Sequence, residues 1–199
     1  MESRFTATVV RATGSWYDVL HDGAMLRCRI RGKLRLKGVR STNPVVVGDE
    51  AVCEADGGDC VIVDIVPRRN YVIRRASNLS KESHIIAANV DQALVIFAVS
   101  RPNPNLGLLD RFLVTMARQN LPTIICFNKL DLKEDCEELR RIYEKSGCQV
   151  IFTSTKTNEG IDQVKKLLWK KTTTVAGPSG VGKSSMINLL YPHADMEIG

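Results

Sequence analysis

One glycine-rich motif in the sequence is suited to binding phosphate. Residues 177–184 read Gly-Pro-Ser-Gly-Val-Gly-Lys-Ser and match the pattern G-x-x-x-x-G-K-[ST]. Glycines let such a loop wrap closely around phosphate oxygens, the N-terminus of the following helix adds positive potential, and Lys183 supplies a full charge. Ser184 would ligate magnesium. The predicted phosphate-binding residues are Gly177, Pro178, Ser179, Gly180, Val181, Gly182, Lys183, Ser184 and Ser185.

A second motif predicts which base the site selects. Asn128-Lys129-Leu130-Asp131 follows an apolar strand expected at 123–127. A carboxylate accepts hydrogen bonds from the N1–H and amino groups of guanine, whereas N1 of adenine is an acceptor, so Asp131 would select guanine. We expect Asn128 to hold the loop and touch the base, and the aliphatic part of Lys129 to cover a ring face.

A third loop follows the next expected strand, where Ser154, Thr155 and Lys156 occur. The backbone N–H of Thr155 is expected to bond the guanine carbonyl. Three such loops at strand ends of one domain predict a guanine-nucleotide site. The alternative is an ATP-binding protein in which the N-K-x-D sequence is fortuitous, and competition between nucleotides would separate the two.

The elements around these motifs alternate between strand and helix. Strands are expected at 93–99, 123–127, 150–153 and 173–176, and helices at 106–119, 137–145, 161–169 and 183–190. This rhythm predicts a parallel sheet with flanking helices that binds ligands at the carboxyl ends of its strands. We therefore assign residues 90–199 to a P-loop domain.

The first 66 residues have a different pattern. Apolar residues alternate with polar ones in about five short segments separated by turns such as Asp22-Gly23. A five-stranded barrel of the oligonucleotide-binding (OB) type fits this count, although a small barrel with another kind of partner fits it too. The polar and basic residues 67–89 are predicted to be a linker.

A run of basic residues lies within the predicted barrel. Between 27 and 37 a Lys or Arg occurs at every second position, so in an extended chain all six would share one face. Such a face favours a polyanion, and we predict nucleic-acid contact; the alternative is a solvated strand edge protected against aggregation. Trp16 and Tyr17 could stack on bases or lie in the core. The predicted RNA-binding residues are Arg27, Arg29, Arg31, Lys33, Arg35 and Lys37.

Composition restricts the class of protein. The 199 residues are 44% apolar and carry a net charge of +6, enough apolar sequence for a sizeable core. No window approaches the length of a membrane span, so we expect a cytoplasmic protein without membrane contact. The six cysteines form no C-x-x-C pair, and we expect them to be reduced and buried, with neither a zinc site nor a disulfide.

The order of the motifs is unusual, because Asn128 precedes Gly177, whereas in familiar GTPases the P-loop comes first. Behind an OB-like barrel, this circularly permuted order resembles the ribosome small subunit-dependent GTPase A (RsgA, YjeQ) family. The likeness covers nearly the whole chain. It is carried by the segments 31–35, 43–49, 89–92, 109–113, 128–131 and 179–185.

This resemblance implies a GTPase that binds GTP or GDP with magnesium, is stimulated by the small (30S) ribosomal subunit, and places its barrel on ribosomal RNA during late maturation. We expect a monomer. The family continues with switch segments, an Asp-x-x-Gly loop and a carboxyl-terminal zinc domain, none of which occurs in this sequence. We therefore expect an amino-terminal portion, truncated at its C-terminus, with little turnover and no assignable catalytic residue. The alternative is an RNA-binding module whose nucleotide domain is vestigial.

Overall fold

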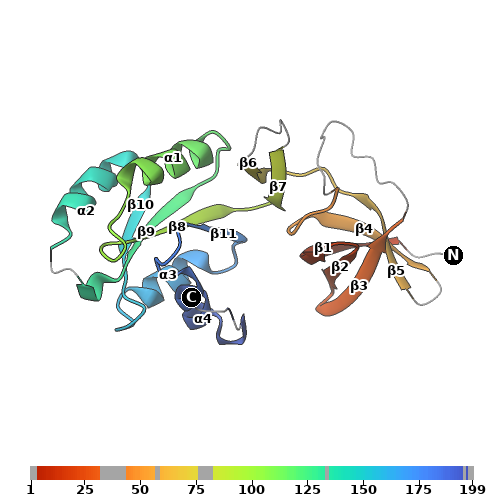
Figure 1. The fold of residues 1–199 in the computed structure, drawn as a ribbon. Helices are drawn as coiled ribbons and strands as arrows, with labels where there is room; N and C mark the ends of the chain where they lie inside the picture. The colour runs from red at the N-terminus through yellow and green to blue at the C-terminus, as the bar shows by residue number, and fades with distance from the viewer. Residues whose placement is uncertain are drawn as a thin grey trace. The chain divides into compact units, whose positions relative to one another are not determined.

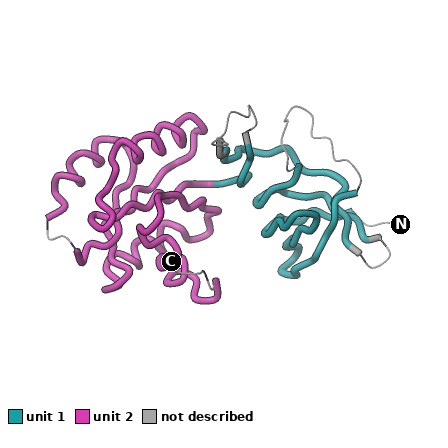
Figure 2. Tube along the Cα trace, viewed as in Figure 1, with its two compact units in different colours: residues 1–90 teal, residues 91–199 magenta. Residues whose placement is uncertain are grey.

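The chain folds into two compact units, Met1–Val90 and Asp91–Gly199 (Figure 2). The computed structural model describes residues 4–31, 44–56, 59–75, 83–132, 135–194 and 196.

The first unit contains a closed barrel of five strands, as the sequence predicts (Figure 1). The strands follow the spatial order β1-β2-β3-β5-β4, and β4 pairs back with β1. All pairs are antiparallel except β3 with β5. The strand bounds are β1 Arg4–Thr13, β2 Trp16–His21, β3 Ala24–Ile30, β4 Glu50–Asp56 and β5 Asp59–Ile65.

Alternation of side chains builds the barrel core. Tyr17 and Val19 of β2 are buried while their neighbours are less so, the period-two pattern of a strand with one face inward. Asp22 and Gly23 both have positive φ, 47° and 80°, as the two-residue hairpin between β2 and β3 requires. The core residues are Ala7, Val9, Tyr17, Val19, Cys28, Val45, Ala51, Cys53 and Ile62.

Two further strands occupy part of the predicted linker. β6 (Tyr71–Arg75) and β7 (Ser83–Ala88) form an antiparallel hairpin. Val46 packs against Ile85 and Ala88, so this hairpin adds a small apolar cluster to the first unit. The sequence did not predict these strands because residues 67–89 are predominantly polar. Few of the described side chains of β6 and β7 are buried, so the segment lacks a clear apolar pattern.

The expectation of six reduced cysteines is wrong for two of them. Cys28 and Cys60 form a disulfide, with Cα atoms 4.5 Å apart. They face each other across the parallel β3–β5 pair, so barrel closure brings together residues that no local spacing pattern connects. Cys53, Cys126 and Cys148 are free thiols.

The second unit is a parallel sheet in the order β10-β9-β8-β11. Every residue of β8 is buried, as expected of a strand covered on both faces. α1 and α2 cover one face of the sheet, and α3 and α4 cover the other (Figure 1). The bounds are β8 Gln92–Ala98, α1 Leu106–Ala117, β9 Thr123–Asn128, α2 Glu137–Tyr143, β10 Gln149–Phe152, α3 Ile161–Leu168, β11 Thr173–Ala176 and α4 Lys183–Leu190, with 3-10 turns at Leu130–Leu132, Glu144–Ser146 and Pro192–Ala194.

The connections define where a ligand can bind. β8 leads to α1 on one face, whereas its neighbour β11 leads to α4 on the other, so the sheet has a topological switch point between these strands. Open parallel sheets bind ligands in the crevice at this point, at the carboxyl ends of the strands. The glycine-rich loop 177–182 lies there, between β11 and α4.

Candidate nucleotide-binding site

The backbone of the glycine-rich loop needs glycine at particular positions. Gly177, Gly180 and Gly182 have φ of +145°, +75° and +91°. A Cβ on Gly177 would collide with the carbonyl of Ile96 in β8, and one on Gly182 would collide with the side-chain amide of Asn128. Close packing against the neighbouring strand ends therefore fixes the shape of this loop.

Lys183 begins α4 and closes the loop. Its Nζ donates a 2.6 Å hydrogen bond to the carbonyl of Pro178, which holds the ammonium group beside the loop. The first N–H groups of a helix have no acceptor within the helix and carry positive potential. The N-terminus of α4 and the Lys183 ammonium therefore meet at one place, which suits an anion such as phosphate.

Asn128, the last residue of β9, joins three loops. It is fully buried, and its Nδ2 donates a 2.9 Å hydrogen bond to the carbonyl of Val181. Its Oδ1 accepts hydrogen bonds, each 3.2 Å long, from the Thr153 hydroxyl and the Thr155 backbone N–H. The side chain thus fixes the loop after β9, the glycine-rich loop and the loop after β10 relative to one another.

This arrangement differs from one expectation. The Thr155 N–H, assigned from the sequence to the guanine carbonyl, here donates to Asn128. The tight turn after β10 directs this N–H inward, toward the buried amide.

Asp131 is oriented by a serine from the third loop. The Ser154 hydroxyl donates a 2.6 Å hydrogen bond to Asp131 Oδ1, and Ser154 itself is fully buried. Ser154 Oγ in turn accepts from the backbone N–H groups of Lys156 and Thr157, at 3.2 Å each. The carboxylate of Asp131 is exposed, so it is held at one oxygen and remains open to a ligand.

Lys129 contacts a loop that sequence reasoning missed. Its Nζ donates a hydrogen bond to the carbonyl of Arg101, which follows β8. The next residue, Pro102, lies 3.8 Å from where a Cβ on Gly180 would stand. The loop after β8 is thus part of the site, and its place at the switch point was the signal that could have revealed it.

A buried thiol lies next to the threonine that donates to Asn128. Cys126 Sγ lies 3.3 Å from the Thr153 hydroxyl, which donates to Asn128. Burial raises the pKa of the Cys126 thiol to about 11, with a smaller opposing effect from the Thr153 hydrogen bond. The thiol is therefore neutral near pH 7 and acts as a packing and hydrogen-bonding group.

Three of the predicted RNA-binding residues on the barrel, Arg27, Arg29 and Arg31, are described, and they differ in their contacts. Arg27 and Arg29 are exposed, with guanidinium carbons 4.6 Å and 4.9 Å from the ring centre of the half-buried Trp16. Arg31 instead forms a 2.7 Å ion pair with the buried Glu54. Tyr17 lies in the core. Lys33, Arg35 and Lys37 lie outside the described residues.

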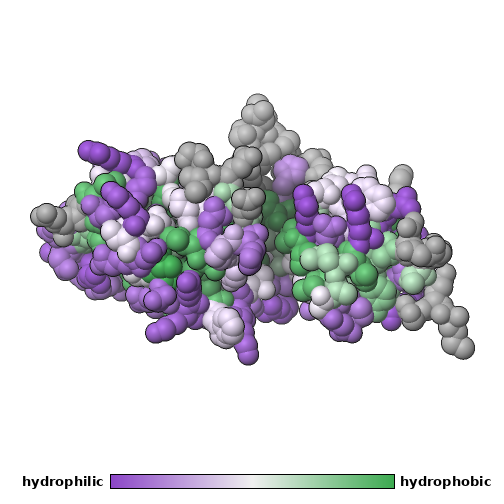
Figure 3. All heavy atoms as spheres, turned by 90° about the horizontal axis from the view of Figure 1, so that it is seen from below, coloured by the Kyte–Doolittle hydropathy of each residue, from purple (hydrophilic) through white to green (hydrophobic). Residues whose placement is uncertain are grey.

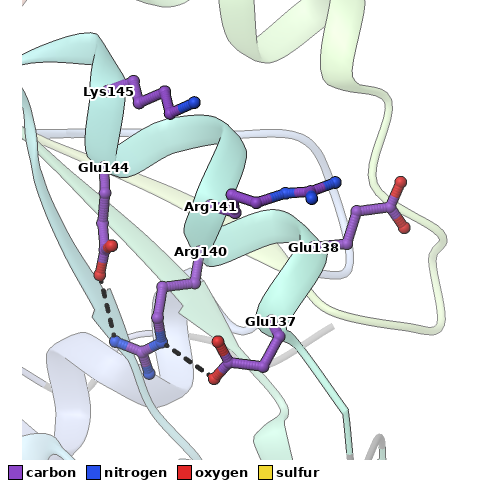
Figure 4. Close-up of a pocket in the computed structure, with 6 residues that line it drawn as sticks. All are labelled: Glu137, Glu138, Arg140, Arg141, Glu144 and Lys145. Carbon is purple, nitrogen blue, oxygen red and sulfur yellow. Dashed lines mark ion pairs between the residues drawn. The ribbon is translucent and has the colours of Figure 1, made fainter.

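Other surface features lie outside these loops. In a hollow on α2, Arg140 forms 3.5 Å ion pairs with Glu137 and Glu144 (Figure 4). Exposed pairs of this kind contribute little stability. Seen from below, hydrophobic areas interrupt the hydrophilic surface of both units (Figure 3). Within the described part of the chain, no helix has the length and hydrophobicity needed to cross a membrane.

Fold and site together define a P-loop nucleotide-binding domain in circularly permuted order, preceded by a five-stranded barrel. The chain belongs to the RsgA GTPase family. A family model described as RsgA GTPase matches residues 65–199, and one described as RsgA N-terminal domain matches residues 6–62. The resemblance inferred from the sequence motifs is thereby confirmed.

Curated relatives and solved structures agree with this assignment. The small ribosomal subunit biogenesis GTPase RsgA of Porphyromonas gingivalis (strain ATCC 33277) is 48% identical over 200 residues, covering 96% of this chain and 64% of that protein. The protein of the same name from Bacteroides fragilis (strain NCTC 9343) is 41% identical over 196 residues, covering 95% and 63%. The chain thus spans somewhat less than two thirds of these relatives.

Two solved structures share the fold. YjeQ from Thermotoga maritima has a TM-score of 0.75 and 32% identity, covering 99% of this chain and 68% of its own. YloQ, described as a circularly permuted GTPase, has a TM-score of 0.72 and 31% identity, covering 96% and 66%.

Proposed function

We propose that this chain binds guanine nucleotides at the three loops joined by Asn128, and that it belongs to a GTPase acting in maturation of the small ribosomal subunit. The observation that carries the proposal is the set of hydrogen bonds from Asn128 to Val181, Thr153 and Thr155. They hold together the glycine-rich loop, to which we assign phosphate binding, and the loops after β9 and β10, to which we assign base binding. The names of the curated relatives supply the cellular process.

Base selection rests on Asp131. Its exposed carboxylate, oriented by Ser154, accepts from the N1–H and amino groups of guanine and repels the N1 acceptor of adenine. The aliphatic part of Lys129 would pack on the base, because its bond to the Arg101 carbonyl stretches the side chain toward the neighbouring loop.

Phosphate binding rests on the N-terminus of α4. On binding, Lys183 exchanges the Pro178 carbonyl for phosphate oxygens, and the first N–H groups of α4 donate to them. Ser184 fits magnesium because its hydroxyl is a hard oxygen ligand in the first turn of α4, beside Lys183. Magnesium, when bound, neutralises phosphate charge.

Hydrolysis requires more than these loops supply. Phosphoryl transfer needs an oriented water and stabilisation of charge on the γ-phosphate. The 199-residue sequence has no Asp-x-x-Gly loop, so we assign no catalytic residue and expect this chain alone to bind nucleotide but turn over little. We also propose that the small ribosomal subunit stimulates hydrolysis.

The barrel would contact ribosomal RNA. Arg27 and Arg29 present two exposed charges on Trp16, a combination suited to phosphates and unstacked bases. We propose a cytoplasmic monomer whose partner is the small subunit, with residues 1–66 as the RNA-binding domain.

The test is a titration with fluorescent GDP, competed by GTP or by ATP, with and without small ribosomal subunits. GTP should displace the probe and ATP should not. Equal displacement by both nucleotides would contradict the guanine site. Absence of nucleotide binding with retained subunit binding would favour an RNA-binding module with a vestigial nucleotide domain.

A further inference from the structure

Three cysteine sulfurs meet inside the barrel, where the nucleotide site makes no use of them. The Sγ atoms of Cys28, Cys53 and Cys60 lie within 4.8 Å of one another, and Cys28 is bonded to Cys60. Because two of the three sulfurs are bonded to each other, the cluster offers a metal ion one thiol instead of the three thiolates that a soft-metal site uses.

The disulfide joins β3 and β5, the parallel strand pair of the barrel. β3 and β5 are paired at three register positions, Cys28 with Cys60, Arg29 with Val61 and Ile30 with Ile62. The other four strand pairs of the barrel each have five or more described register positions. A covalent bond therefore reinforces the strand pair of the barrel with the fewest described register positions.

The two bonded cysteines differ in access. Cys28 is fully buried, whereas Cys60, the second residue of β5, is half-buried. Exchange of a disulfide begins when a thiolate attacks one of the two sulfurs, so the reaction needs access to that sulfur. Because no part of Cys28 is exposed, whereas Cys60 is partly exposed, an attack on the folded barrel falls on Cys60.

Cys53 does not compete in this reaction. It is fully buried, and burial raises the pKa of its thiol to about 11. Because the thiolate is the nucleophile, a neutral thiol in the core does not attack the neighbouring disulfide while the barrel is folded.

We propose that the Cys28–Cys60 pair is a redox modification site of the barrel, whose co-substrate is a small thiol and whose attacked sulfur is that of Cys60. The incoming thiolate forms a disulfide with Cys60 as the Cys60–Cys28 bond breaks, and Cys28 leaves as a thiolate that takes a proton. A second small thiolate then attacks the sulfur of the first, which releases Cys60 as a thiol and a small-molecule disulfide. The chain gains two electrons and two protons, and two small thiols are oxidised. The site does not depend on the proposed nucleotide or RNA binding.

The first test uses the whole chain, purified without reductant. After denaturation and alkylation, peptide mapping should recover Cys28 and Cys60 as one linked pair and the other cysteines alkylated. Brief treatment of the folded oxidised chain with reduced glutathione, followed by an acid quench that stops further exchange and by peptide mapping, should place the mixed disulfide on Cys60. Alkylation of both Cys28 and Cys60 in the oxidised chain, or a mixed disulfide on Cys28, would overturn the proposal.

Two variants provide the matched comparison. With oxidised glutathione, Cys28→Ser should acquire glutathione on Cys60, whereas Cys60→Ser should not acquire it on Cys28; Cys148→Ser, outside the barrel, should behave like the unmodified chain. Reductant should lower the barrel's unfolding temperature by roughly 10 °C or more in the unmodified chain and leave that of Cys28→Ser unchanged. Equal glutathione labelling of both variants, or an unfolding temperature of the unmodified chain that does not respond to reductant, contradicts the assignment.

Discussion

The side-chain amide of Asn128 donates a hydrogen bond to the backbone carbonyl of Val181, although 53 residues separate them in the sequence. This bond connects the end of β9 with the glycine-rich loop between β11 and α4. The contact does not depend on the order of the two loops along the chain, because both loops lie at strand ends of the same sheet.

Asn128→Ala should weaken nucleotide binding and lower stability. It removes three hydrogen bonds and leaves buried partners unpaired, at a cost of about 2–4 kcal/mol in the free energy of unfolding. Denaturant unfolding and GDP titration measure the two effects. Asn188→Ala, which loses hydrogen bonds to Met196 but touches none of the three loops, is the control. Similar nucleotide affinity in both variants would refute the role of Asn128 in holding the three loops together.

Ser154→Ala should reduce guanine affinity by about tenfold, which corresponds to ~1.4 kcal/mol. The substitution removes the hydroxyl that orients Asp131 and leaves the carboxylate free to rotate. Competitive titration measures the loss. Ser146→Ala removes a hydroxyl bonded to the Tyr143 carbonyl and should not change affinity. An unchanged affinity for Ser154→Ala would mean that Asp131 needs no orientation.

Gly182→Ala should abolish nucleotide binding through a collision and not through backbone strain alone. Gly182 and Gly147 have similar positive φ, +91° and +75°, so alanine at either position costs about 1–2 kcal/mol. A Cβ at Gly147 meets open space, whereas one at Gly182 meets the Asn128 amide. Isothermal titration of both variants separates the effects, and retained binding by Gly182→Ala would show that the loop can move away.

Tyr143 should make the second unit less stable at high pH. Its hydroxyl lies 3.1 Å from Asp110, and burial, with a further contribution from Asp110, raises the pKa of Tyr143 from 10.0 to about 12. The folded state thus holds the phenolic proton more tightly than the unfolded state. The stabilisation, at most roughly 2–3 kcal/mol, is complete below pH 10 and disappears as the pH rises toward 12.

Comparison with Tyr143→Phe isolates this effect from other groups that titrate in the same range. From pH 9.5 upward, the free energy of unfolding of the unmodified chain should fall relative to that of Tyr143→Phe, by the amount given above. A difference independent of pH would exclude the raised pKa.

Local patterns predict most of the fold. Period-two alternation gives the barrel strands, and α4 begins at Lys183 as the glycine-rich motif indicates. The Cys28–Cys60 disulfide is not predicted, because it depends on the pairing of β3 with β5, two strands far apart in the sequence. Long-range pairing has no local signature. The β6–β7 hairpin is not predicted, because its segment is mostly polar.

The motifs predict the residues of the candidate site, and that assignment stays a prediction; the contacts among its loops could not be read from the sequence. The motifs identify Asn128, Asp131 and Lys183, yet not the Thr155 N–H that points to Asn128 or the Arg101 carbonyl that holds Lys129. Those contacts arise from loop shape. The basic run is likewise only partly a shared surface, because Arg31 is paired with a buried glutamate while Arg27 and Arg29 pack on Trp16.

Nucleotide selectivity after Asp131→Asn tests the guanine-nucleotide assignment most directly. The carboxamide offers a donor where guanine has its amino group, so GTP binding should fall by at least about a hundredfold, ~2.7 kcal/mol. Xanthosine triphosphate, which has a carbonyl at that position, should bind this variant better than it binds the unmodified chain. Asp135→Asn, at an exposed aspartate beyond the motif, is the control. If Asp131→Asn binds GTP, ATP and xanthosine triphosphate as the unmodified chain does, Asp131 does not read the base and the guanine-nucleotide assignment is wrong.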